Sequence, residues 1–158
     1  MEAKRVPLSN IIDKYDRFLL DCDGVIWRGM DAIPGSGDTI EKLLAAGKEV
    51  ILVTNATRKS RADIQDKLRH CSLPHIDSEN IYAANIATAK WLKINHPEIK
   101  KVYMACEPGC ADAIRAEGFE VVGEEDRSKQ GSIESVEALE VDPEVGAVVT
   151  GICLKFNY

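Results

Sequence analysis

Two aspartates separated by one residue stand directly after a short apolar run. The run covers residues 18–20, and Asp21 and Asp23 follow it. Side chains at i and i+2 leave an extended strand on the same face, so both carboxylates can point into one site. Neighbouring carboxylates repel each other unless a proton or a hard cation such as Mg²⁺ lies between them. The pair therefore predicts magnesium-assisted chemistry, with Asp21 and Asp23 as candidate catalytic and metal-binding residues.

Other kinds of site also use an Asp-x-Asp motif. An EF-hand loop needs an oxygen ligand at its fifth position and Gly at its sixth, whereas Val25 and Ile26 stand there. A receiver domain takes its acidic pair and its acceptor Asp from different strands, so it does not fit either. A plain Asp-Gly turn at Asp23 stays open as an alternative, since this dipeptide is common in turns.

Polar and basic residues follow a second apolar run, at residues 50–53. Thr54 and Asn55 come first, and a hydroxyl with backbone N–H groups at this point can hold a phosphate oxygen. Arg58 belongs to a basic segment at the start of the next helix, where each cation opposes the helix dipole by about 0.3–1 kcal/mol. A bound anion would offset that cost. Thr54, Asn55 and Arg58 are therefore candidate phosphate-binding residues, although an ordinary loop and a solvated basic turn would look the same.

Strand and helix signals alternate along the chain. The apolar run at 18–20 is consistent with a buried strand, and the run at 50–53 shows no polar alternation, which suits a parallel sheet covered on both faces. Further strands are expected at 81–82, 101–105 and 146–149, and helices at 36–46, from 60 onward, at 85–94 and at 108–117. This order predicts an α/β fold with right-handed crossovers. In such sheets, ligand sites lie beyond the carboxyl ends of the strands.

The composition excludes several kinds of partner. The chain has 158 residues and a net charge of −6. This acidity argues against nucleic acid or an anionic membrane as the main partner, because both select basic surfaces. No stretch is long enough for a membrane span, and the N-terminus shows no signal peptide pattern. Five scattered cysteines fit reduced thiols and give no zinc pattern. We expect a cytoplasmic protein that acts on a small substrate.

Together these motifs resemble the haloacid dehalogenase (HAD) superfamily of phosphatases. The closer similarity is to its 4-nitrophenylphosphatase, phosphoglycolate phosphatase and pyridoxal phosphatase branch. It rests on the following segments: Asp21-Cys22-Asp23-Gly24-Val25-Ile26-Trp27, Ile33-Pro34-Gly35, Val53-Thr54-Asn55, Lys59-Ser60-Arg61 and Phe156-Asn157-Tyr158. The resemblance covers nearly the whole chain. It implies a Rossmann-like core over residues 1–84 that leads into an inserted α/β cap over residues 85–158, with the cap incomplete.

The resemblance also implies a mechanism. Asp21 attacks phosphorus and forms an aspartyl-phosphate, while Asp23 protonates the leaving alcohol and then activates the water that clears the intermediate. Mg²⁺ is held by the carboxylate of Asp21, by a phosphate oxygen and by the backbone carbonyl of Asp23. The implied substrate is a small phosphorylated metabolite of the phosphoglycolate or 4-nitrophenyl phosphate type.

Three departures from the family pattern bear on activity. Ala56 stands where the family usually has a second Asn, and residues 150–153 lack an Asp that relatives often carry. Family members are also about twice as long, and their later Lys and further metal-binding acids have no counterpart up to Tyr158. We therefore expect the 158-residue chain alone to be inactive, and a truncated, non-catalytic isoform or interaction module is the alternative. An uncovered sheet edge would favour a homodimer.

Overall fold

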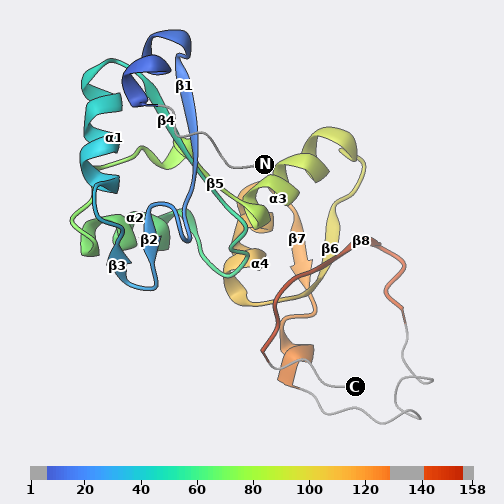
Figure 1. Cartoon of the computed structure of the whole chain (residues 1–158). Helices are drawn as coiled ribbons and strands as arrows, with labels where there is room; N and C mark the ends of the chain where they lie inside the picture. The colour runs from blue at the N-terminus through green and yellow to red at the C-terminus, as the bar shows by residue number, and fades with distance from the viewer. Residues whose placement is uncertain (1–6, 129–140, 155–158) are drawn as a thin grey trace, which may run out of the picture. The chain divides into compact units, whose positions relative to one another are not determined.

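Helices and parallel strands alternate along the chain, as the sequence predicts. The computed structural model describes residues 7–128 and 141–154. These residues form parallel sheets flanked by helices, so the α/β fold class is confirmed (Figure 1). In these ranges no helix is long and apolar enough to cross a membrane. The tripeptide at residues 156–158, on which part of the resemblance rests, lies outside the described ranges.

The chain divides into two units, which are described separately. One unit comprises Met1–Thr54 with Arg61–Tyr82, and the other comprises Asn55–Ser60 with Ala83–Tyr158. The break at residues 82–83 lies close to the boundary expected between a core and a cap. The assignment of the units to a core and a cap stays a prediction.

The first unit is built on a parallel sheet with the strand order β1-β4-β5. Its strands are β1 (Arg17–Asp21), β4 (Glu49–Thr54) and β5 (Ile81–Ala83). The other elements are the short antiparallel strands β2 (Trp27–Arg28) and β3 (Asp31–Ala32), the helices α1 (Ser36–Ala45) and α2 (Arg61–His70), and the 3₁₀ helices Leu8–Asn10, Ile12–Lys14 and Ser78–Asn80. Strands β1 and β4 run parallel and pair from Arg17 to Asp21. Their carboxyl ends therefore lie side by side.

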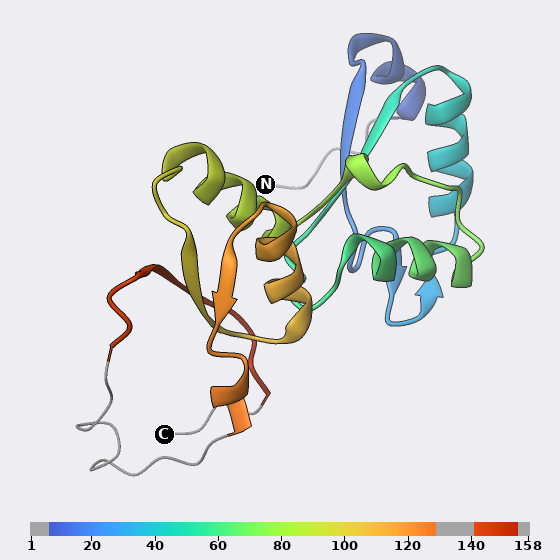
Figure 2. The same ribbon diagram turned by 180° about the vertical axis from the view of Figure 1, so that it is seen from behind.

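One face of this sheet is well covered and the other is not. Val50 and Leu52 of β4 are buried, as is Leu43 of α1, which lies beside β1 and β4 in both views (Figures 1 and 2). On the opposite face Leu19 is 65% exposed and Val53 is 38% exposed. The prediction that both faces are covered is therefore wrong for the described residues. An apolar run indicates that a strand is suited to burial. It does not indicate which helices or strands are present to cover it.

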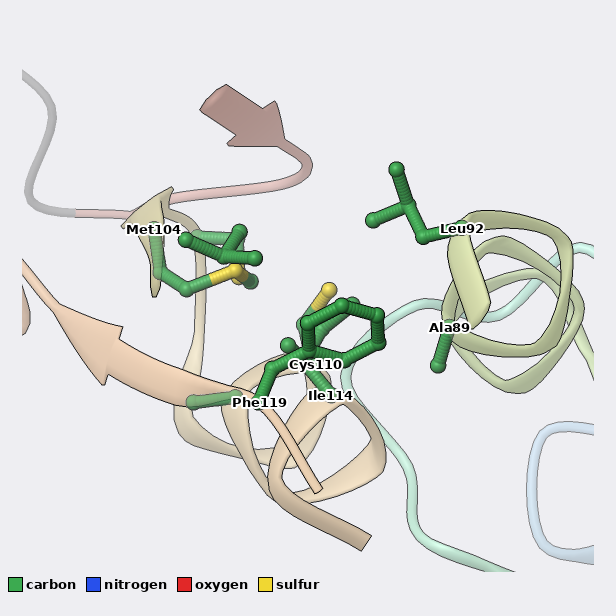
Figure 3. Close-up of a cluster of buried hydrophobic side chains, with 9 residues drawn as sticks. Ala89, Leu92, Met104, Cys110, Ile114 and Phe119 are labelled. Atoms are coloured by element: carbon green, nitrogen blue, oxygen red, sulfur yellow. The ribbon is translucent and has the colours of Figure 1, made fainter. Parts of the chain in front are cut away.

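The second unit contains another three-stranded parallel sheet, with the order β7-β6-β8. Its elements are β6 (Lys101–Ala105), β7 (Glu120–Val122), β8 (Val145–Thr150), α3 (Ala84–Asn95), α4 (Pro108–Ala116) and a 3₁₀ helix at Glu125–Ser128. Pro108 opens α4, where its fixed φ and missing N–H cost nothing. Figure 3 shows the core of this unit, where buried side chains of α3 and α4 meet Met104 of β6.

A buried asparagine ties the segment 55–60 to the helices of the second unit. Asn85, at 1% exposure, donates from Nδ2 to the carbonyl oxygen of Lys59 at 3.1 Å and to that of Gly109 at 2.8 Å. The backbone of α4 also approaches this segment closely, because a Cβ atom on Gly109 would lie 2.2 Å from the carbonyl oxygen of Arg58. The segment that carries Asn55 and Arg58 is thus fixed within the second unit.

This close approach gives a stability prediction. Gly109→Ala should lower the free energy of unfolding by about 3 kcal/mol, because the added methyl group meets backbone atoms that cannot rotate away. Gly37→Ala is the matched control, since its Cβ would meet Leu73 Cδ2 at an ordinary 3.4 Å. Urea unfolding followed by circular dichroism measures both variants. Equal midpoints for the two variants would contradict the close packing at Gly109.

Candidate active site

A tight turn follows Asp21, the last residue of β1, and carries Asp23. The backbone N–H groups of Ile26 and Trp27 donate to the carbonyl oxygen of Cys22 at 2.9 and 3.1 Å, and that of Gly24 donates to the carbonyl oxygen of Trp27 at 2.7 Å. Gly24 has φ +89°, a conformation that favours glycine. The Asp-Gly turn considered as an alternative is therefore present. It holds Asp23 in place and is compatible with a catalytic role for that residue.

The side chains of Asp21 and Asp23 are both exposed to solvent, although the two residues do not belong to one continuous strand. β1 ends at Asp21, and Asp23 is joined to Trp27 by an isolated bridge. The expected alternation still holds, because Asp21 and Asp23 are exposed while Cys22 between them is fully buried. Both carboxylates can therefore reach a ligand from solvent, as a catalytic pair requires.

Asp23 is held by three side chains from different elements. The indole Nε1–H of Trp27 donates to Oδ1 at 2.9 Å, and Nζ of Lys67 on α2 lies 3.6 Å from the same oxygen. The hydroxyl of Thr54 makes a longer contact of 3.4 Å to Oδ2. Nζ of Lys67 also lies 4.3 Å from the ring centroid of Trp27. The site thus places one cation and two hydrogen-bond donors around a single carboxylate.

The predicted phosphate-binding residues divide between the two units. Thr54 ends β4, is 4% exposed and reaches Asp23 because β1 and β4 end together. Asn55 and Arg58 are exposed and belong to the second unit. The structure therefore brings Thr54 to Asp23, while the binding roles of all three residues stay predictions.

The thiol of Cys22, between the two aspartates, is a poor candidate for a nucleophile. Burial raises the pKa of its thiol to about 12, and the negative charges of Asp23 and Asp21 add to this increase against the opposing charge of Lys67. A thiol with so high a pKa stays protonated near pH 7, where only the thiolate is a strong nucleophile or metal ligand. The candidate reactive groups that stay at this turn are the carboxylate oxygens.

The donor set fits a hard cation. Across residues 7–128 and 141–154 no group of three or more His, Cys, Asp or Glu side chains is placed to hold a metal ion. Two carboxylates at the end of β1 offer oxygen alone, and Mg²⁺ commonly binds one or two carboxylates, keeps several waters and completes its shell with substrate phosphate. The carboxylates of Asp21 and Asp23 offer the oxygen ligands that suit Mg²⁺, whereas zinc prefers His and Cys.

Sequence reasoning did not identify Lys67 as part of the site, and it quoted Trp27 only within a motif. Lys67 lies in a helix between the buried residues Ile64 and Leu68, where a lysine usually faces solvent. Trp27 offered one signal, since a buried indole N–H normally requires an acceptor. That acceptor is Asp23.

The chain also matches known proteins. A family profile described as "Haloacid dehalogenase-like hydrolase" matches residues 18–120. Among curated proteins, phosphoglycolate phosphatase 2 of Arabidopsis thaliana is 37% identical over 95% of this chain and 50% of its own length. The 4-nitrophenylphosphatase of Schizosaccharomyces pombe is 36% identical over 95% of this chain and 51% of its own length. The chain spans about half the length of the curated relatives it matches.

Solved structures show the same fold. A p-nitrophenyl phosphatase from Archaeoglobus fulgidus matches 68% of this chain and 40% of its own, with a TM-score of 0.62 and 31% identity. The 4-nitrophenylphosphatase of Thermotoga maritima matches 94% of this chain and 49% of its own, with a TM-score of 0.72 and 19% identity. A glycerol phosphate phosphatase from Mycobacterium tuberculosis, solved with magnesium, matches 94% and 39%, with a TM-score of 0.72 and 17% identity. At such low identity the last two similarities concern the fold alone.

Proposed function

Because this chain belongs to the haloacid dehalogenase-like hydrolase family, we propose that it supplies the nucleophile and the acid/base residue of a magnesium-dependent phosphomonoester hydrolase. The observation that carries the proposal is the turn after β1. There Asp21 is exposed, and Asp23 is held by Trp27, Lys67 and Thr54. The names of the relatives favour a small phosphorylated substrate of the phosphoglycolate or 4-nitrophenyl phosphate type.

In the proposed reaction the two carboxylates divide the work. A carboxylate oxygen of Asp21 attacks phosphorus, the bond from phosphorus to the ester oxygen breaks, and Asp23 gives its proton to the leaving alcohol. Asp23 then takes a proton from water, which attacks the aspartyl-phosphate and releases phosphate and the free Asp21 carboxylate. Mg²⁺ would neutralise phosphate charge at Asp21 and the backbone carbonyl of Asp23. A covalent path of this kind suits a reaction whose uncatalysed form is so slow that enzymes accelerate it by up to about 10²¹-fold.

The metal proposal has a direct test. We expect EDTA to abolish hydrolysis of 4-nitrophenyl phosphate by a form of the protein that is active, and Mg²⁺ to restore it, because the exposed candidate ligands at the end of β1 are the carboxylate oxygens of Asp21 and Asp23. Zinc added at equal concentration is the control. Full recovery with zinc and none with magnesium would show that the hard-cation assignment is wrong.

The phosphate-binding proposal concerns Thr54 and Asn55, with Arg58 as a weaker candidate. Thr54 already lies beside Asp23, and the loop after β4 offers backbone N–H groups to an anion. A crystal soaked with tungstate, a phosphate mimic, should place the anion within hydrogen-bond reach of the Thr54 hydroxyl. Thr54→Val, which keeps the side-chain shape and removes the hydroxyl, should weaken tungstate binding. An anion bound far from both Asp21 and Thr54 would refute the assignment.

A non-catalytic interaction module of the same family is the second candidate. One observation favours it: Leu19 is exposed on a sheet face that the described residues leave uncovered. Purified 158-residue chain without Mg²⁺-dependent turnover would favour this alternative. A homodimeric state and a cytoplasmic location also stay proposals.

A further inference from the structure

Asp23, Trp27 and Lys67 form a closed triangle of contacts. Trp27 Nε1 lies 2.9 Å from Asp23 Oδ1, Lys67 Nζ lies 3.6 Å from that oxygen, and Lys67 Nζ lies 4.3 Å from the Trp27 ring centroid. Three elements contribute, namely the turn after β1, strand β2 and helix α2. All three residues belong to the first unit.

The contacts differ in rigidity. Trp27 is 2% exposed and its backbone is pinned to Cys22 and Gly24, so its indole N–H is a fixed donor. The side chain of Asp23 is 55% exposed, and solvent alone would not hold it in one rotamer. The side chain of Lys67 is 21% exposed and is steadied by the ring of Trp27, because a cation over an indole face is attracted to it.

Stability does not account for the Lys67 contact. An ion pair with an exposed partner is usually worth only about 0–1 kcal/mol. The geometry is more informative, because both contacts fall on the same oxygen of Asp23. The other oxygen, Oδ2, has the long 3.4 Å contact to the Thr54 hydroxyl. The two oxygens of the Asp23 carboxylate thus have different contacts.

We propose that Trp27 and Lys67 are positioning residues for Asp23, which hold its Oδ1 and leave Oδ2, beside Thr54, as the oxygen that serves the substrate. The inference rests on the proposed function for the role of Asp23. Its structural part, the fixed orientation of the Asp23 side chain, does not depend on turnover. In this role both residues act through Asp23, the residue that they contact.

The test uses NMR on the 158-residue chain, because Asp23 orientation can be measured without activity. Three-bond couplings to the Asp23 carboxyl carbon report whether its χ1 angle occupies one rotamer or several. We expect one rotamer in the unchanged chain and rotamer averaging in Lys67→Met and Trp27→Phe. Lys67→Arg, which keeps a cation, should restore the single rotamer. Lys93→Met is the matched control, since Lys93 lies 5.9 Å from the Phe119 ring centroid in the second unit.

A second readout comes from the indole groups. The chain has two tryptophans, so a ¹⁵N spectrum contains two indole signals, and Trp91→Phe assigns them. The Trp27 indole proton should shift upfield in Asp23→Ala, where its acceptor is lost. The melting temperature of each variant shows that it is folded. Lys67 has a partly exposed side chain, so we expect Lys67→Met to fold. This variant tests the proposal even where Trp27→Phe does not fold.

The outcomes are distinct. An unchanged single Asp23 rotamer in folded Lys67→Met would overturn the role of Lys67, and the same result in folded Trp27→Phe would overturn that of Trp27. An indole signal that does not respond to Asp23→Ala would remove the hydrogen bond on which both roles depend. If the couplings change as expected and no form of the protein hydrolyses phosphate esters, the positioning stands and the proposed function fails.

Discussion

Asp21→Asn should reduce turnover of 4-nitrophenyl phosphate by on the order of 10³-fold or more, in any form of the protein that hydrolyses this ester. The amide keeps the shape of the side chain but has no anionic oxygen to attack phosphorus, and the covalent intermediate cannot form. Asp21 is exposed at the end of β1, so the substitution leaves the buried core unchanged. The loss should therefore appear in kcat without a comparable loss of stability.

The measurement combines steady-state kinetics with acid quenching. The unchanged protein should yield a phosphorylated peptide that contains Asp21, and Asp21→Asn should yield none. Asp112→Asn is the matched control, because Asp112 is an exposed aspartate on α4 in the second unit. Retention of a tenth of the original kcat by Asp21→Asn would show that another residue is the nucleophile.

The isolated 158-residue chain should show no efficient Mg²⁺-dependent turnover, well below the roughly 1 s⁻¹ at the lower end of ordinary enzyme rates. No group of three or more His, Cys, Asp or Glu side chains within residues 7–128 and 141–154 is placed to hold a metal ion. Two carboxylates alone bind Mg²⁺ weakly, because this ion prefers octahedral oxygen coordination and gives up its waters reluctantly. Stabilisation of developing charge, usually the largest contribution to catalysis, would then be incomplete.

The same chain should self-associate. Leu19 is 65% exposed on β1, which is the outer strand of the sheet that the described residues form, and an outer strand can pair with another chain. Sedimentation velocity should show species larger than the monomer, and Leu19→Lys should shift the distribution toward the monomer. Ile94→Lys is the control, since Ile94 is 76% exposed on helix α3 rather than on a sheet edge. A stable monomer with turnover near 1 s⁻¹ or above would overturn both parts of this prediction.

Features that depend on neighbouring residues could be predicted from the sequence. The apolar run before Asp21 marked a strand, and β1 ends at that residue. Pro108 marked the first turn of a helix, and α4 begins there. The strand expected at 101–105 has these bounds as β6. These sequence patterns predict structure because the residue types at a few neighbouring positions decide strand burial, helix starts and turns.

Shorter elements escaped prediction. Strands β2 and β3 have two residues each, and β7 has three, which is too few for a periodic pattern. Each forms because a partner strand supplies hydrogen bonds. The residues of a short strand do not indicate which other strand it will pair with. The prediction that both faces of the sheet are covered was also wrong. The exposure of Leu19 depends on which other elements pack against its face.

The sequence by itself determined the alternation of strands and helices, and it predicted Asp21 and Asp23 as the catalytic pair. The tertiary structure alone decided the surroundings of that pair. Lys67 comes to Asp23 from a helix 44 residues further along the chain, through packing of Ile64 and Leu68 that no local pattern specifies. Thr54 reaches it because β1 and β4 pair in parallel and end together. Local residue types set which groups can react, and long-range packing sets which groups meet.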